Sequence, residues 1–159
     1  MLPDWVFDDH DRAFMSEALD EAKAAGARGE IPVGAIVTCN RQVISRAGNR
    51  RMELHDPAGH AEVLALQGAG RHLGDWRLEE CTLYVTLEPC PMCAAACRQA
   101  RVGLVVWGAP DPQAGACGSV INLAEDARLG PPLAHRGGLD ASASSELLRA
   151  FFAKQRQST

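Results

Sequence analysis

Two short motifs contain residue types that bind transition metals and transfer protons. One is His60-Ala61-Glu62, and the other is Cys90-Pro91-Met92-Cys93. If a helix begins at the proline, both sulfurs lie on its first turn and face the same point. Proline suits the first helical position, because its missing N–H costs nothing there. The positive end of the helix dipole favours thiolate, which is the form that binds metal. The second motif therefore predicts a pair of metal-binding thiolates.

His60 supplies a third type of ligand to this pair. Three protein ligands and one open position are typical of catalytic zinc, whereas a structural zinc site is closed by a fourth cysteine or histidine. The sequence contains no second Cys-x-x-Cys. We therefore expect His60, Cys90 and Cys93 to bind Zn²⁺. Glu62, two residues after the histidine, is placed to transfer protons rather than to bind the metal.

Other interpretations of these motifs stay open at this point. A lone Cys-x-x-Cys can be redox-active or part of a structural zinc knuckle. Thioredoxin-like chemistry does not require His60 and Glu62, and a structural zinc protein is expected to unfold when its metal is removed. Glu62 could also be a solvated acid in the first turn of a helix, where the dipole favours negative charge.

The composition is that of a globular protein. A chain of 159 residues can bury one core, so we expect a single domain over residues 1–159. Apolar residues make up 47% and charged residues 23%, with no run of about 18 apolar residues that could span a membrane. The first five residues lack the layout of a signal peptide. We therefore interpret the six cysteines as reduced and predict a cytoplasmic location.

The charge distribution does not by itself indicate a nucleic-acid-binding protein. The net charge is −4, and residues 1–30 contain eight acidic and three basic residues. The remainder of the chain is close to neutral, and almost all of its basic residues are arginine, which suits contacts with phosphate. Four of them are candidates for such contacts, although a solvated arginine is the default: Arg50, Arg51, Arg98 and Arg101.

The elements that must position the two motifs alternate between helix and strand. Asp8 to Asp11 can cap a helix that runs to about Ala25. The patterns then predict strands at 31–39 and 42–47, joined by a tight turn, and a helix that begins at Asp56-Pro57 and ends by 68–70. Cys81 to Leu87 is the clearest strand, because its large apolar residues alternate.

A helix from Pro91 to Ala100 and an apolar strand at 102–107 follow that strand. Such a strand–helix–strand unit has a right-handed crossover and a parallel pair, with its chemistry at the carboxyl end of the first strand. Glycine and proline interrupt residues 108–140, where we expect a short helix at 120–127 and a last strand near 133–136. Residues 142–156 are predicted to form a closing helix.

The chain resembles the bacterial tRNA adenosine deaminases, which convert adenosine to inosine at the wobble position of an anticodon. The His-x-Glu and Pro-Cys-x-x-Cys motifs are the signature of the zinc nucleobase deaminases and alone indicate only the wider cytidine deaminase-like superfamily. The narrower resemblance rests on blocks spread over nearly the whole chain: 30–35, 48–50, 55–57, 82–90, 108–109 with Asp111, 115–116 with 118–119, and 151–152.

This resemblance implies a three-layer α/β/α sandwich around a mixed five-stranded sheet, usually as a homodimer that acts on the tRNA anticodon stem-loop with Zn²⁺ as cofactor. It also implies that Asn49 contacts the target nucleoside, while Glu30 and Val33 line the base pocket. His55 would orient the substrate or its flanking nucleotides, and Asp111 would lie near the substrate backbone. Turn, core or surface roles for these five residues remain open.

The chain departs from the family pattern after Trp107. Many relatives carry Arg-Asp and then a lysine there, whereas this chain has Pro110-Asp111-Pro112-Gln113. Two positive charges are therefore absent, which weakens contact with phosphate. A deaminase of a free nucleobase or nucleoside, such as guanine, cytosine or cytidine, is the alternative. A silent subunit that only helps a partner to bind RNA is a third possibility, but such a subunit would not need Glu62.

Overall fold

A five-stranded mixed sheet organises the computed structural model, which describes residues 6–158; the interpretation of residues 1–5 lies outside it. The strand order is β2-β1-β3-β4-β5. Strand β1 (Gly34–Cys39) pairs antiparallel with β2 (Gln42–Gly48) and β3 (Cys81–Leu87). Strands β4 (Leu104–Ala109) and β5 (His135–Gly137) continue parallel to β3. The predicted mixed sheet is confirmed.

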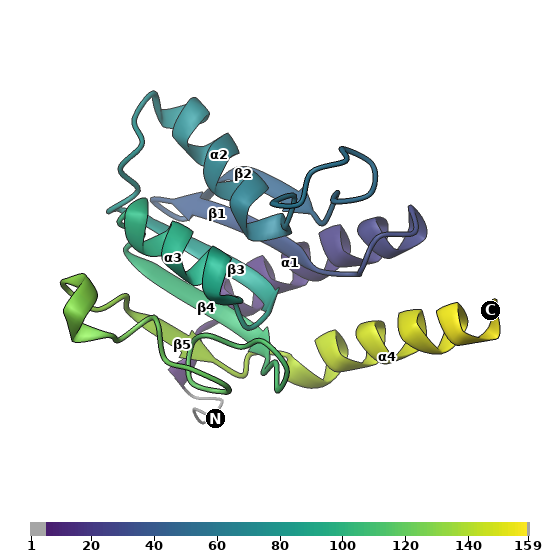
Figure 1. Ribbon diagram of the computed structural model, residues 1–159. Helices are drawn as coiled ribbons and strands as arrows, with labels where there is room; N and C mark the ends of the chain where they lie inside the picture. The colour runs from purple at the N-terminus through teal and green to yellow at the C-terminus, as the bar shows by residue number, and fades with distance from the viewer. Residues whose placement is uncertain (1–5, 159) are drawn as a thin grey trace.

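Four helices cover the two faces of this sheet (Figure 1). Helices α1 (Asp9–Ala27) and α4 (Ala141–Gln157) lie on one face, and α2 (Ala61–Leu73) and α3 (Pro91–Gln99) lie on the other. Side chains alternate across the strands, so Tyr84 packs toward α1 and its neighbour Val85 toward α2 and α3. The result is the expected three-layer sandwich with one apolar cluster on each side of the sheet.

The local signals of the N-terminal half explain most of its elements. Asp8 caps α1, and its carboxylate accepts a hydrogen bond from the Asp11 N–H while the Asp11 carboxylate accepts one from the Asp8 N–H. The β1–β2 hairpin turns at Asn40 and Arg41, whose φ angles of 51° and 60° suit a two-residue hairpin turn.

Helix α2 differs from its predicted bounds at both ends. It begins at Ala61 rather than at Asp56-Pro57, because the Asp56 carboxylate caps a separate turn by accepting a hydrogen bond from the Ala58 N–H at 2.9 Å. It also continues past Gly68 to Leu73 and ends at Gly74, which has a φ of 68°. Gly68 lies inside the helix, and a Cβ atom there would meet the Ser45 hydroxyl on β2. The glycine thus marks a close approach of helix and strand rather than a helix end.

The helix predicted at 120–127 is wrong. This segment instead forms an isolated bridge between Cys117 and Asn122, followed by a short 3-10 turn, η2 (Ala127–Leu129). The Arg98 guanidinium on α3 donates hydrogen bonds to four backbone carbonyls in and just after this segment: those of Leu123, Ala124, Gly130 and Pro131. Arg98 therefore holds this segment against α3.

The end of the chain agrees with its predicted elements. The strand expected near 133–136 is β5, and the closing helix expected at 142–156 is α4. Within residues 6–158, no helix combines the length and apolar character needed to cross a membrane.

Candidate metal centre and substrate site

The starts of two helices bring the motif residues together. His60 is the N-cap of α2 and Cys90 is the N-cap of α3, and both have extended backbone. Pro91 occupies the first position of α3, so Cys93 is the third residue of that helix, as the spacing predicted. Helices α2 and α3 lie on the same face of the sheet, where these two helix starts can meet (Figure 1).

The geometry of these three side chains fits a zinc ion. The His60 Nδ1 atom lies 3.4 Å from the Cys93 sulfur and 3.6 Å from the Cys90 sulfur. Ordinary Zn–N and Zn–S bond lengths in a tetrahedral site place nitrogen and sulfur about 3.6 Å apart. All three candidate ligand atoms lie within 4.8 Å of one another. His60, Cys90 and Cys93 are therefore positioned to bind a metal, and a donor set of one imidazole and two sulfurs suits zinc.

The two cysteines of this cluster differ in their tendency to ionise. A hydrogen bond with Cys93 lowers the pKa of Cys90 to about 4, and the hydrogen bond with His60 acts in the same direction. The same cysteine–cysteine contact, together with burial, raises the pKa of Cys93. The hydrogen bond with Cys90 also raises the pKa of His60. The metal-free cluster therefore shares protons that a bound metal would displace.

Glu62 is not a solvated acid. It is the second residue of α2, and only 4% of its surface is exposed. Burial raises the pKa of its carboxyl, against the opposing effect of a hydrogen bond from its own backbone N–H. A buried carboxyl beside the His60 and Cys93 cluster, with its pKa raised by burial, is suited to accepting and releasing a proton.

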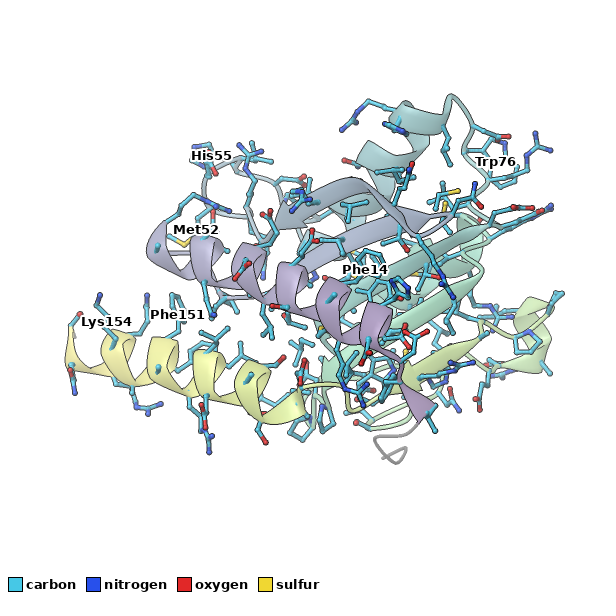
Figure 2. The ribbon with its side chains drawn as sticks, turned by 180° about the vertical axis from the view of Figure 1, so that it is seen from behind. Phe14, Met52, His55, Trp76, Phe151 and Lys154 are labelled. Carbon is cyan, nitrogen blue, oxygen red and sulfur yellow. The ribbon has the colours of Figure 1, made fainter. Side chains whose placement is uncertain are left out.

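Three of the five residues predicted to contact substrate line one surface hollow of about 500 Å³. Glu30, Asn49 and His55 form part of its wall, and Phe151 and Phe152 of α4 form another part. Figure 2 shows His55 on the loop after β2 and Phe151 on α4 at the same end of the molecule. The structure thus brings residues 30–55 and residues 151–152 to one place.

Asn49 and Glu30 also shape the loop that carries His55. The buried Asn49 side chain accepts a hydrogen bond from the Arg51 N–H at 3.0 Å. The buried Glu30 carboxylate accepts hydrogen bonds from the N–H groups of Met52 and Glu53 at 3.1 and 3.0 Å. Both side chains therefore hold the backbone of residues 51–53, just before His55.

The other two predicted residues lie outside this hollow. Val33 is 7% exposed and belongs to the apolar cluster beneath α2, although its carbonyl accepts a hydrogen bond from the Asn49 N–H at 3.0 Å. Asp111 follows β4 and accepts a hydrogen bond from the Gln113 N–H at 3.0 Å. Its own N–H donates to Glu88, a buried residue for which the sequence patterns predicted no role.

Comparison with known proteins identifies the family. A model of the cytidine and deoxycytidylate deaminase zinc-binding region matches residues 8–109. This chain belongs to that deaminase family. The deaminase is 43% identical over 147 residues to the tRNA-specific adenosine deaminase of Bacillus subtilis, covering 92% of this chain and 91% of that protein. It is also 43% identical to its counterpart in Agrobacterium fabrum, covering 90% and 94%.

Solved structures agree with this assignment. A structure from studies of A-to-I editing by tRNA:A34 deaminases is 43% identical to the deaminase and superimposes with a TM-score of 0.83, covering 86% of this chain and 99% of that one. The guanine deaminase of Nitrosomonas europaea superimposes with a TM-score of 0.77 at 26% identity, covering 89% and 84%. Together with the His60, Cys90 and Cys93 cluster, these findings identify a zinc-dependent hydrolytic deaminase.

Proposed function

We propose that this deaminase converts adenosine to inosine at the wobble position of tRNA. The observation that carries the proposal is the extent of the similarity. It covers 92% of the chain, whereas the match to the wider family ends at residue 109. The part beyond residue 109 includes α4, whose Phe151 and Phe152 share a hollow with Asn49 and His55. We also propose that residues 1–159 act as one domain, since α4 packs on β3 and β4, and Cys90 of the metal cluster follows β3.

In this proposal His60, Cys90 and Cys93 bind Zn²⁺, which supplies a Lewis acid that makes a water molecule a better proton donor near neutral pH. Glu62 is the catalytic residue. It accepts a proton from the attacking water and delivers it to the ring nitrogen beside C6 of adenine. It then takes the proton of the new hydroxyl on C6 and transfers it to the departing amine, so that adenosine and water give inosine and ammonia. Burial of Glu62 keeps this proton from exchanging freely with solvent.

Three of the proposed substrate contacts, Glu30, Asn49 and His55, line the hollow beside α4. Asn49 contacts the target nucleoside, while Glu30 and Val33 shape the base pocket through the loop and strand that they hold. His55 is exposed, as expected for a residue that meets flanking nucleotides. Asp111 lies at the carboxyl end of β4, the edge of the sheet at which α/β proteins place ligands.

A deaminase of a free base is the second candidate. The likeness to guanine deaminase structures supports it, and so does the absence of basic residues at 110–113. We favour tRNA because identity is higher with the tRNA:A34 deaminase structure, at 43%, than with the guanine deaminase structures of Bacillus subtilis and Nitrosomonas europaea, at 32% and 26%.

We further propose that the enzyme is a cytoplasmic homodimer. Three large apolar side chains are exposed on α2, on the turn after it and on α3: Leu73 by 41%, Trp76 by 59% and Met92 by 37%. Leu73 and Trp76 lie at or just after the end of α2 and Met92 in the first turn of α3, so this layer exposes apolar side chains at both of its ends, which a second copy would bury. Sedimentation velocity is expected to give a dimer for the native chain and a monomer for Trp76→Glu. A monomeric native enzyme with full activity would contradict the proposal.

A substrate panel tests the function. The zinc-loaded enzyme is incubated with an anticodon stem-loop that carries adenosine at the wobble position, and separately with guanine, adenosine, cytosine and cytidine. Ammonia release is measured in each sample. We expect ammonia from the stem-loop alone. Turnover of a free compound with an inert stem-loop would retain the zinc mechanism and overturn the substrate.

A further inference from the structure

A buried carboxylate stands between the metal cluster and the loop after β4. Glu88 follows the last residue of β3, and its surface is 1% exposed. Its oxygens accept hydrogen bonds from the backbone N–H groups of Asp111, Cys117 and Ser119 at 3.2, 3.0 and 3.2 Å. They also accept one from the Ser119 hydroxyl. No basic side chain among residues 6–158 forms an ion pair with Glu88, so these four donors alone compensate the buried carboxylate.

The loop of residues 111–119 is closed around this carboxylate. A Cβ atom on Gly115 would overlap the Glu88 side chain, so the backbone can approach only because residue 115 is glycine. The Gly115 N–H donates to the Asp111 carbonyl at 2.9 Å, which ties the two ends of the turn together. Glu88 therefore occupies the centre of the loop rather than its edge.

The same loop is fixed directly beside a metal-binding residue. The Ala116 N–H donates to the Pro89 carbonyl at 2.8 Å, and Pro89 immediately precedes Cys90. Glu88 thus connects Asp111, a proposed substrate contact, to the segment that carries the first cysteine. A change in the Glu88 contacts would move Asp111, a proposed substrate contact, without replacing any of the three candidate ligands.

We propose that Glu88 is a positioning residue, which holds the 111–119 loop in the register that substrate binding requires. This inference rests on the proposed function for its choice of substrate. Glutamine is the informative replacement, because it keeps the shape of the side chain. It also replaces one acceptor oxygen with an NH₂ group that faces N–H donors. Glu88→Gln therefore loses contacts with the loop without creating a cavity.

The test compares Glu88→Gln with Glu80→Gln. Both acids flank β3: Glu80 is exposed and immediately precedes the strand, whereas Glu88 immediately follows it. In Glu88→Gln we expect the amides of residues 111–119 to exchange about tenfold faster and the KM for the stem-loop to rise about tenfold. The zinc content and the protection of α3 amides stay unchanged, and kcat changes less than KM. Glu80→Gln is expected to match the native enzyme in every measurement.

Several outcomes would overturn the proposal. Unchanged exchange at 111–119, faster exchange with an unchanged KM, or loss of zinc in Glu88→Gln would each do so. If Glu88→Gln does not fold, Ser119→Ala removes a single donor, and the same exchange and KM criteria apply to it with smaller expected changes. If the native enzyme does not turn over the stem-loop, the proposed function fails. In that case, the role of Glu88 is decided by amide exchange in Glu88→Gln together with its KM for the free compound that the native enzyme deaminates.

Discussion

The Nδ1 atom of His60 lies 3.4 Å from the Cys93 sulfur, although the two residues are 33 positions apart in the chain. The contact exists because α2 and α3 begin at the same end of one sheet face, and each helix starts at or just before its metal-binding residue. Metal affinity and reactivity therefore depend on where two helices begin, and this relationship leads to the predictions below.

Glu62→Gln is expected to keep zinc and the native circular dichroism while turnover falls by about 10²–10⁴-fold, because the amide cannot carry the transferred proton. Zinc content and single-turnover deamination measure the two effects separately. The exposed Glu146→Gln on α4 serves as the control and is expected to remain active. Near-native turnover in Glu62→Gln would show that another group transfers the proton.

Removal of zinc by a chelator is expected to end turnover without unfolding the domain, because the apolar clusters on both faces of the sheet do not include His60 or Cys90. Far-UV circular dichroism and activity are measured before and after chelation, and again after zinc is restored. Loss of secondary structure with the metal would instead indicate a structural zinc site.

Cysteine alkylation is expected to report the metal site directly. Zinc should protect Cys90 and Cys93 from iodoacetamide, and chelation should expose Cys90 in particular, because its thiol is half-buried and its pKa is lowered to about 4. Cys97 and Cys117 are buried, and burial raises the pKa of both thiols, so they should stay unmodified with or without zinc. Peptide mass spectrometry distinguishes the sites. Equal labelling of Cys90 with and without zinc would exclude it as a ligand.

Arg98→Ala is expected to lower the free energy of unfolding by about 2–3 kcal/mol, because four carbonyls lose a charged hydrogen-bond donor. Arg101→Ala is the matched control, since its guanidinium is exposed and makes only surface contacts: one of 3.5 Å with Glu79 and one with the Trp76 ring, whose centre lies 5.3 Å away. Urea unfolding measures both variants. Equal stability of the two would contradict a bracing role for Arg98.

Phe152→Ala tests whether α4 takes part in RNA binding. The Phe152 side chain is 43% exposed beside the hollow that contains His55, so stacking on a base is expected to contribute about 1–3 kcal/mol. We expect the KM for the stem-loop to rise about tenfold while the melting temperature is retained. Leu129→Ala, an exposed apolar residue in η2, is the control. A lower melting temperature with an unchanged KM would assign Phe152 to packing alone.

Much of the fold was predictable because its signals are local. The alternating strand Cys81–Leu87, the proline that opens α3 and the acidic cap of α1 each act within a few residues. The start of α2 was not predictable, because Asp56-Pro57 is a good helix start by sequence. In the folded chain Asp56 caps a separate turn, and α2 begins after His60, whose side chain makes no capping hydrogen bond.

The remaining differences come from contacts between distant residues. The sequence pattern of the segment after residue 119 is typical of a helix. In the structure, however, two of its carbonyls accept hydrogen bonds from Arg98 on α3. The role of Glu88 was equally hidden from the sequence. The partners of its carboxylate lie 23 to 31 residues further along the chain, and nothing within the Glu-Pro-Cys block indicates them. The types and spacing of the metal-binding residues were visible in the sequence, whereas the residues that hold the surrounding loops in place were not.

Position specificity within one RNA is the most direct test of the central claim. Two anticodon stem-loops of identical composition would be compared, one with its loop adenosine at the wobble position and the other with that adenosine moved one nucleotide along. Inosine would be quantified by mass spectrometry after incubation with the zinc-loaded enzyme, with Glu62→Gln as the blank. We predict inosine in the first RNA alone. Equal conversion of both RNAs, or conversion of neither, would contradict a wobble-position tRNA adenosine deaminase.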